Sequence, residues 1–490
     1  MTPVITNNSS DLSGDGLSRR KFIFMSAVAA GGLAAGGCAS PRPRPRLVSA
    51  NEKLNIAIVG YGGKGASDAD CCAGQNIVAL CDADEKIGAE VRQRYPKAKY
   101  YQDFRQMLEK EKSIDALDIA TPDHLHAYIA AMAMNMGKHV YVQKPLTHSV
   151  YEARLLRKLA AKNKVATQMG NQGSAENGLR RAVEVIQAGL IGNVHDVHVW
   201  TNRPIWPQGL ERPEGSDPVP EGMDWDLWLG PAPVRPFKGN KVYHPFVWRG
   251  RLDFGTGALG DMACHTCNLP FRALKLGYPT EIEAETVDLT KDCYPIQSRI
   301  RFQFPAREGL VPVTFRWYDG GKRRGQSSHD GSNKPPKEVT ADILTIQQSV
   351  PNSGCLILGD KGQIFSPDDY GTTFDLKLKD EAEFSPGATH PAVKAIPQTI
   401  PRNSHMSGSG RNRGGSDGAQ HLEWIDACKG GQPGYSNFDI AAYLTEIMLL
   451  GCVAIRTGKK LEWDGPNMRA KNAPEASQFV HPSFRKGWQL

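Results

Sequence analysis

Residues 54–65 read LNIAIVGYGGKG. A short apolar run ends there in Gly60, Gly62 and Gly65, which fit the G-x-G-x-x-G pattern of a strand that turns tightly into a helix. The first glycine would permit the turn, the second would leave room for a pyrophosphate, and the third would let helix and strand pack closely. The phosphates would then meet free N–H groups at the helix N-terminus. The residues that this pattern assigns to a dinucleotide are Gly60, Tyr61, Gly62, Gly63 and Gly65.

An acidic residue follows the next apolar strand. That strand, NIVALCD, ends at Asp82, about 20 residues after Gly60, where a ribose hydroxyl would need a hydrogen-bond acceptor. A carboxylate at this point repels a 2′-phosphate, so the sequence favours NAD(H) over NADP(H). The alternative is an α/β domain whose glycine-rich turn binds no nucleotide.

The bulk composition is that of an ordinary globular protein. The chain has 490 residues, of which 40% are hydrophobic and 23% charged, so we expect two domains with sizeable cores. The net charge of +7 is modest and spread out, and nothing in the sequence resembles a nucleic-acid-binding face. The one dense basic tract, PRPRPR at 41–46, lies in a predicted linker, 39–53, and indicates an extended spacer.

The N-terminal segment has the layout of a twin-arginine export signal. Residues 18–23, SRRKFI, precede an apolar, glycine-rich stretch that is too short to indicate a membrane span. Cys38 follows Ala-Gly-Gly, which approximates a lipoprotein cleavage site, so a lipid anchor on Cys38 stays open. We expect residues 1–38 to be a signal peptide that the twin-arginine machinery recognises, and the protein to be periplasmic or a membrane-anchored lipoprotein. The alternative is a disordered tail.

The cysteines indicate buried thiols rather than disulfides. The chain has ten cysteines, and those outside Cys38 lie mostly in apolar runs. Proteins exported by the twin-arginine route fold before export, in a reducing compartment, which disfavours disulfides. Residues 264–267, CHTC, form a C-x-x-C pair without a second pair elsewhere, so we expect no metal site.

From Leu54 to about Gln172, apolar strands alternate with amphipathic stretches, which is typical of a parallel sheet with crossover helices. This rhythm predicts a complete doubly wound dinucleotide-binding domain over 54–190. The predicted strands are 54–59, 76–81, 98–101, 114–120, 139–143 and 165–169, and the predicted helices are 63–73, 84–94, 102–111, 124–136 and 148–162.

The pattern changes after about residue 190. Longer strands alternate in polarity, which predicts a largely antiparallel sheet with one covered face in a second α/β domain, 191–490. The remaining stretches are a Pro/Trp-rich segment, long loops, three helices and a tail that we expect to pack back on the body. The predicted strands are 196–200, 281–289, 298–304 and 311–318, the helices are near 257–275, 417–429 and 439–457, and the loops are 203–250, 320–352 and 380–416.

Polar residues follow the fourth, fifth and sixth strands of the first domain. Residues 121–126, TPDHLH, follow the fourth strand, and Lys144 in HVYVQKP follows the fifth. The sixth strand ends in QMGNQ, which includes Asn171. Because the carboxyl ends of parallel strands border the ligand crevice, we expect these side chains to meet there.

A second candidate group lies in the glycine-rich stretch FGTGALGDMACH. Asp261 and His265 are four residues apart and share one face of the predicted helix. The carboxylate can orient the imidazole, and the imidazole can accept a proton from a substrate hydroxyl. The alternative is a capped helix with a structural ion pair.

These motifs resemble the Gfo/Idh/MocA family of oxidoreductases over nearly the whole chain after residue 54. The carriers of the resemblance are QKP at 143–145, TPDHLH at 121–126 and the D-x-x-x-H pair of Asp261 and His265. The family implies a Rossmann domain, a C-terminal α/β domain often used for oligomer contacts, and a sugar or cyclic polyol bound between them. We therefore expect a homo-oligomer.

The resemblance also implies roles for individual residues. Lys144 would orient the reacting hydroxyl and also border the cofactor, His265 would act as general base, and Asp261 would orient the histidine. His126 and Asn171 would line the nicotinamide and substrate edge, and Thr121 and Pro122 would also contact the cofactor. The chain departs from the family at Gln143, where glutamate is common, and at Asp123, where asparagine is common. The loss of charge at Gln143 would lower the pKa of Lys144 or loosen its position.

Residues 243–253 supply aromatic rings and arginines just before the Asp261 helix. Aromatic faces stack on sugar C–H surfaces, and arginines bind hydroxyls or carboxylates. The candidate substrate contacts are Tyr243, Trp248 and Arg249. The alternative is a loop that packs between the domains.

Together these features predict an exported NAD(H)-dependent oxidoreductase that acts on a sugar, polyol or glycoside hydroxyl. Because little soluble NAD is expected outside the cytoplasm, we expect a tightly bound cofactor that is recycled in each turnover. One alternative is a glycosidase that uses NAD to form a transient ketone. Another is a noncatalytic carbohydrate-binding protein on the same fold.

Overall fold

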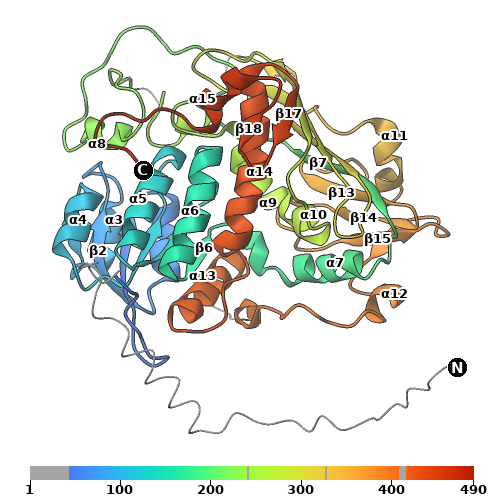
Figure 1. Ribbon diagram of the computed structural model, residues 1–490, viewed down its shortest axis with the longest axis horizontal. Coiled ribbons are helices and arrows are strands. Elements are labelled where there is room, and N and C mark those ends of the chain that lie inside the picture. The colour runs from blue at the N-terminus through green and yellow to red at the C-terminus, as the bar shows by residue number, and fades with distance from the viewer. Residues whose placement is uncertain (1–42, 240–241, 326–327, 408–414) are drawn as a thin grey trace, which may run out of the picture. The chain divides into compact units, whose positions relative to one another are not determined.

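The computed structural model describes residues 43–239, 242–325, 328–407 and 415–490. The predicted export signal and Cys38 lie outside these residues. Elements carry the labels of Figure 1.

The first part of the chain forms a six-stranded parallel sheet, which confirms the predicted Rossmann fold. The strand order is β3-β2-β1-β4-β5-β6. The order reverses between β1 and β4, and ligands bind doubly wound sheets at this switch point. The strands are β1 Asn55–Val59, β2 Asn76–Cys81, β3 Lys99–Tyr101, β4 Ala116–Ile119, β5 His139–Val142 and β6 Thr167–Met169, and the helices are α2 Lys64–Cys71, α3 Ala89–Arg94, α4 Phe104–Lys110, α5 Asp123–Asn135, α6 Val150–Asn163 and α7 Asn177–Gln187.

The predicted helix over 84–94 is wrong in its first turn, because α3 begins only at Ala89. The Asp84 N–H donates to Asp82 Oδ1 (3.1 Å), and the Glu85 N–H donates to the carbonyl of Gly222 (2.8 Å). These hydrogen bonds hold the residues before α3 in a turn beside the end of β2.

The second part forms a ten-stranded sheet, which confirms the predicted α/β domain. The order is β16-β15-β14-β13-β7-β10-β9-β8-β17-β18, and all pairs are antiparallel except β7 with β10. The sequence predicted β7 to β10 but not β13 to β15. The strands are β7 Val194–Thr201, β8 Glu281–Val287, β9 Gln297–Phe304, β10 Val313–Gly320, β13 Gly354–Gly359, β14 Gly362–Ser366, β15 Asp375–Leu378, β16 Ser385–Pro386, β17 Leu461–Asp464 and β18 Arg469–Ala470, with a separate hairpin of β11 Arg323–Arg324 and β12 Ser328–His329.

The helix predicted near 257–275 is two helices. α9 covers Gly257–Thr266, and α10 covers Asn268–Ala273. Pro270 has no N–H to donate to the carbonyl of Thr266, four residues earlier, and its ring would clash with that carbonyl, which accounts for the break after Thr266. The other helices are α8 Trp225–Leu229, α11 Lys337–Thr340, α12 Pro391–Lys394, α13 Gly415–Cys428, α14 Phe438–Thr457 and α15 Ser477–Val480.

α14 is the core helix that joins the two sheets. In the described part of the chain it is the one helix long and apolar enough to cross a membrane, but 83% of its most apolar window is buried. It packs on α6, α9 and β8, and Figure 1 shows it between the first domain and the second sheet. Its apolar surface is therefore accounted for by the protein core.

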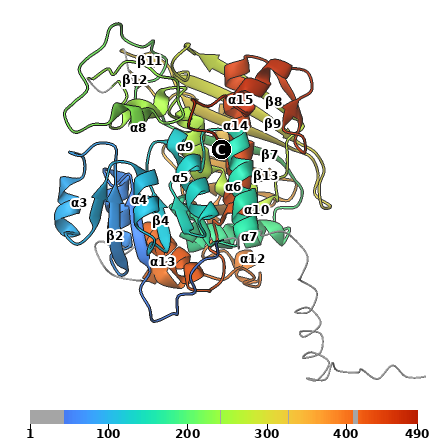
Figure 2. The same cartoon turned by 60° about the vertical axis from the view of Figure 1, so that its left-hand side comes forward.

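α13 belongs to the later part of the chain but completes the core of the first domain. Trp424 and Ile425 lie in the same buried cluster as Ile56 of β1 and Tyr141 of β5. Figure 2 shows this helix, in orange, against the first sheet.

Gly65 determines how closely α2 approaches β1. A Cβ on this residue would lie 1.9 Å from the carbonyl oxygen of Gly60, which is itself fixed by the turn. We therefore predict that Gly65→Ala lowers the free energy of unfolding by about 3 kcal/mol, because backbone must move to relieve the clash.

Gly74→Ala is the matched control, since a Cβ at Gly74 meets nothing within 4 Å. It should change stability by less than about 0.5 kcal/mol. Urea unfolding of both variants measures the difference, and equal effects would contradict this account of the turn.

Candidate active site

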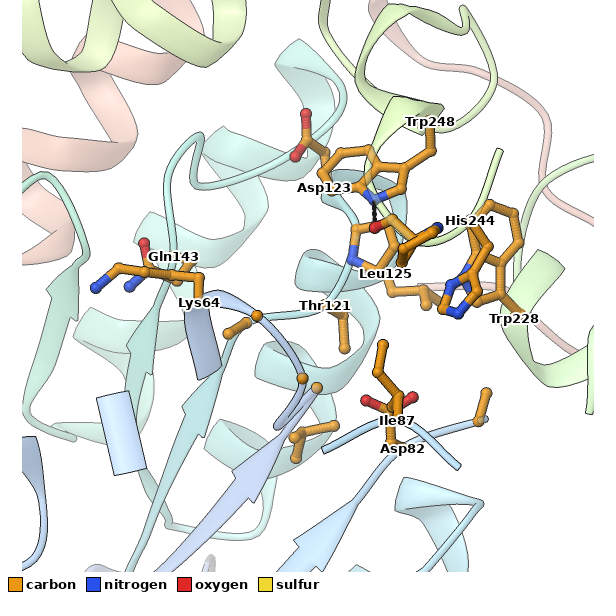
Figure 3. A pocket seen from close by; sticks show the side chains of 18 of the residues that line it. Lys64, Asp82, Ile87, Thr121, Asp123, Leu125, Gln143, Trp228, His244 and Trp248 are labelled. Carbon is orange, nitrogen blue, oxygen red and sulfur yellow. Dashed lines mark hydrogen bonds between the residues drawn. The ribbon is translucent and has the colours of Figure 1, made fainter. Parts of the chain in front are cut away.

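A cavity of about 580 Å³ lies at the carboxyl ends of the first sheet's strands. Figure 3 shows it from close by. Its floor consists of the turn after β1 and the residues that follow β2, β4 and β5. These lining residues include Gly60, Gly62, Gly63, Lys64, Asp82, Thr121, Pro122, Asp123, Gln143 and Lys144.

The turn after β1 has the geometry that the glycine pattern predicts. Gly60 has φ +81°, and a Cβ there would lie 2.7 Å from the backbone of Ala120 at the end of β4. Gly65 packs on this turn and does not line the cavity. The side chain of Tyr61 does not reach the cavity either, because it is fully buried and packs edge-on against Tyr100.

Asp82 lines one end of the cavity, as the sequence predicts, together with Gln102 and Phe104. Burial raises the pKa of its carboxyl to about 6, although the N–H of Asp84 donates to it. Thus at neutral pH Asp82 is mostly ionised and can accept hydrogen bonds. Thr121 Oγ1 is buried and has no hydrogen-bond partner among the described residues, so a bound molecule could supply one.

Two segments from the second domain cover the cavity. We call residues 221–229 and 243–249 the covering segments. Leu227, Trp228 and His244 face the cavity from them. Their attachments to the first domain include a hydrogen bond between His244 Nε2 and Asp84 Oδ2 (2.9 Å) and one from the Asp224 N–H to the Ala83 carbonyl (2.8 Å). Figures 1 and 2 show the green region around α8 over the blue first domain.

The opposite end carries an ion cluster that joins the two domains. Lys144 Nζ lies 3.0 Å from Asp261 Oδ2, and Arg249 Nε lies 3.3 Å from Asp261 Oδ1. Burial raises the pKa of Asp261, but the positive charges of Lys144 and Arg249 outweigh it and hold the pKa below its usual range. Both cations line the cavity, whereas Asp261 lies behind them on α9. The carboxylate therefore fixes two cations against a bound molecule.

His265 lies one turn after Asp261 and is buried. Burial, and then the charge of Lys144, hold the pKa of the imidazole well below its usual range, so it is neutral at pH 7. Nδ1 has no hydrogen-bond partner among the described residues, and the ring meets Tyr370 edge-on at 5.1 Å. His265 does not line the 580 Å³ cavity.

Besides Tyr61, Gly65, Asp261 and His265, three further residues expected at the site lie outside the cavity lining. The ring nitrogens of His126 lie 2.8 Å from the carbonyl oxygens of Thr121 and Pro145, so this residue ties together two loops of the site. Asn171 is fully buried and donates to the carbonyl of Cys264 (2.9 Å). Tyr243 is fully buried among aromatic rings and accepts a hydrogen bond from Arg212. Trp248 and Arg249 do line the cavity.

Sequence reasoning missed several lining residues. Lys64 lies inside the glycine motif, and Gln102 and Phe104 follow β3, so the rule that ligands bind at the ends of strands could have found them. Leu227 and Trp228 come from a segment that has no periodic pattern, and no sequence signal placed them over the first domain; His244 lies in the 243–253 stretch but was not named as a contact.

A buried carboxylate lies beside Gln143. The Gln143 amide donates to Asp68 Oδ2 at 2.8 Å, and Lys64 Nζ lies 2.7 Å from Asp68 Oδ1. The negative charge that position 143 lacks is therefore supplied by Asp68 on α2, and the hydrogen bond to Asp68 fixes the Gln143 side chain. A glutamate at 143 would face Asp68 directly, which gives a physical reason for the amide.

Asp68 belongs to a larger buried ion network. His421 of α13 lies 3.1 Å from Asp118 and 3.6 Å from Asp68. Burial lowers the pKa of His421, but its hydrogen bond to Asp118 and the nearby acids raise it well above its usual range. Cys72, Asp118 and His421 lie close enough to hold a metal ion, but both nitrogens of His421 have oxygen partners, so we interpret the group as ion pairs. The nine cysteines in the described residues are buried and unpaired, as predicted.

We predict that Gln143→Glu destabilises the protein, because it places two carboxylates together in a buried site. Adding Asp68→Asn should recover at least about 1 kcal/mol relative to Gln143→Glu alone. Urea unfolding of both single variants and the double variant measures this coupling. Strictly additive effects would show that the two side chains do not interact.

Two family models match the chain in order. Residues 54–171 match the model described as "Oxidoreductase family, NAD-binding Rossmann fold", and residues 183–308 match "Oxidoreductase family, C-terminal alpha/beta domain".

Curated relatives match over part of their length. Levoglucosan dehydrogenase from Pseudarthrobacter phenanthrenivorans is 24% identical over 230 residues, which cover 44% of this chain and 50% of that protein. Inositol 2-dehydrogenase from Salmonella typhimurium is 27% identical over 151 residues, which cover 30% of this chain and 45% of that protein. The chain thus spans half or less of the length of these relatives.

Solved structures share the fold. An inositol dehydrogenase homolog from Azotobacter vinelandii, in complex with NADH and myo-inositol, aligns over 84% of this chain and 98% of its own, with a TM-score of 0.55 and 15% identity. A levoglucosan dehydrogenase in complex with NADH and levoglucosan aligns over 84% and 99%, with a TM-score of 0.55 and 17% identity.

Proposed function

Because this chain belongs to the Gfo/Idh/MocA family of oxidoreductases, we propose that it is an NAD(H)-dependent dehydrogenase that oxidises a hydroxyl-bearing carbon of a sugar or polyol. One observation carries the proposal. A single cavity has a ribose-binding carboxylate, Asp82, at one end and the cation cluster of Lys144 and Arg249 at the other. The relatives that act on levoglucosan and inositol support the substrate class.

The residues of the cavity fit a dinucleotide. Gly60, Gly62 and Gly63 present backbone without side chains at the start of α2, where a pyrophosphate binds favourably. Asp82 would accept hydrogen bonds from the adenosine ribose and would repel a 2′-phosphate. Thr121 Oγ1 is a buried hydroxyl without a partner among the described residues. When bound, NAD⁺ supplies the hydride acceptor.

The ion cluster suits the chemistry of a hydroxyl that loses a proton. The ammonium of Lys144 would donate a hydrogen bond to the substrate oxygen and stabilise negative charge on it. Asp261 holds Lys144 in place through its 3.0 Å ion pair. Aromatic contacts with the sugar would come from Trp248, and Arg249 would bind a further hydroxyl.

The covering segments support a cofactor that stays bound. They are attached to the loop after β2, next to Asp82, by backbone hydrogen bonds and by the hydrogen bond between His244 and Asp84. A retained cofactor must be reoxidised on the enzyme, either by reducing a second carbonyl compound or by returning the hydride after cleavage of a glycoside. We further propose export by the twin-arginine route, on the strength of residues 18–23.

Asp82→Asn should weaken NAD⁺ binding about 10-fold or more, because the ribose hydroxyls lose a charged hydrogen-bond acceptor. It should also reduce the ratio of the affinity for NAD⁺ to the affinity for NADP⁺. The wild-type affinity for NAD⁺ should fall as the pH drops through about 6, since the Asp82 carboxyl then becomes protonated. Calorimetric titration between pH 5 and pH 8 measures both effects. If the ratio of the affinities for NAD⁺ and NADP⁺ is the same in the variant as in wild type, the proposed role of Asp82 is contradicted.

Lys144→Ala should lower turnover at least about 100-fold while NAD(H) remains bound, because the variant loses the donor to the substrate oxygen. Lys162→Ala, at an exposed lysine of α6, is the control and should match wild type. Absorbance of bound NADH after addition of sugars, polyols and glycosides measures hydride transfer. If wild type binds sugars but reduces no cofactor, the noncatalytic alternative gains support.

A further inference from the structure

Asp123 is a buried acid of the cavity that the roles above leave unused. It begins α5, is 1% exposed and lines the cavity at the end that holds Lys144 and Arg249. Figure 3 shows it beside Trp248. Thr256 Oγ1 donates to its Oδ2 at 2.9 Å. Among the described residues this neutral hydroxyl supplies its only hydrogen bond, so Asp123 is not half of a close ion pair as Asp261 is.

Titratable groups, some charged and some neutral, face Asp123 from the elements packed against it. Burial and the negative charge of Asp261 on α9 raise the pKa of its carboxyl to about 7, against the opposing charges of Arg249 and Lys144. On α5 itself, burial lowers the pKa of His124 to about 3 and that of His126 to about 4, so both are neutral. Burial raises the pKa of Tyr294 and of the Cys264 thiol, and both stay protonated. Asp123 therefore differs from His124, His126, Tyr294 and Cys264, because the pKa of its carboxyl lies near neutrality.

Proton transfer works best when the acceptor has a pKa near the working pH and touches the substrate. His265, to which the family resemblance assigns this task, does not line the cavity. Asp123 and Lys144, the proposed donor to the substrate oxygen, both line it.

We propose that Asp123 is a further catalytic residue, whose carboxylate accepts the proton of the substrate hydroxyl; this inference rests on the proposed dehydrogenase function. In the balanced step, the C–H bond of the carbinol breaks and its electron pair passes as hydride to NAD⁺. The O–H bond breaks, its proton forms an O–H bond on Asp123, and the substrate becomes a carbonyl compound. On reduction, the Asp123 carboxylic acid returns the proton. Thr256 and Arg249 favour the ionised form that must be present before oxidation.

The test is the pH dependence of the hydride-transfer rate in the NAD⁺-loaded full chain, with a substrate from the panel above. In wild type the rate should fall as the pH drops below about 7, because Asp123 becomes protonated. Asp123→Asn keeps the shape of the side chain. It should lower the rate at least about 100-fold and abolish this fall in rate below pH 7, which we call the acidic limb of the pH–rate profile. Thr256→Val should move the limb upward by about 1 pH unit, because the carboxylate loses its hydrogen bond.

Two other variants separate the alternatives. Asp82→Asn, at the far end of the cavity, should change cofactor affinity but keep the limb near pH 7. His265→Asn should also keep the limb, even where it lowers the rate. A limb that persists in Asp123→Asn, vanishes in His265→Asn, or stays fixed in Thr256→Val overturns this inference and leaves the dehydrogenase proposal intact. A wild-type protein that holds NAD⁺ but transfers no hydride from any compound of the panel overturns the proposed function, and this inference with it.

Discussion

The close approach between Gly60 and Gly65 is the constraint on which the rest of the site depends. A Cβ on Gly65 would lie 1.9 Å from the Gly60 carbonyl oxygen, so only glycine lets α2 begin directly beneath the end of β1. The same turn touches the end of β4 at Ala120. The backbone of this turn therefore forms part of the cavity floor. α2, which starts there, places Lys64 and Asp68 next to Gln143, the residue that follows β5.

The second organising contact is the cluster of Lys144, Asp261 and Arg249. Lys144 follows β5 of the first domain, whereas Asp261 and Arg249 come from the second. Buried charges are costly unless paired, so this cluster ties the position of Lys144 to the packing between the domains. α13 adds a second tie, because His421 pairs with Asp68 and Asp118 beneath the first sheet.

Much of this arrangement was predictable from local sequence. The first sheet followed from the alternation of apolar strands with helices, and Asp82, Thr121 and Lys144 followed from the rule that ligands bind at the ends of strands. Trp248 and Arg249 were expected at the site, but the covering segment 221–229 was not, since Trp228 is placed by long-range contacts rather than by periodicity. His126, Asn171 and Tyr243 look like site residues in sequence, but each has its polar atoms engaged by the protein's own groups. A motif records residue types, and only packing decides which of them face a ligand.

The measurement that tests the central claim most directly is the cofactor content of the full chain, purified without added nucleotide. Denaturing the protein and assaying the released molecules distinguishes NAD(H) from NADP(H). The account predicts close to one NAD(H) per chain, held between the glycine turn, Asp82 and the covering segments. A protein that is empty and also fails to bind NAD⁺ on titration, or that carries NADP(H), would contradict it.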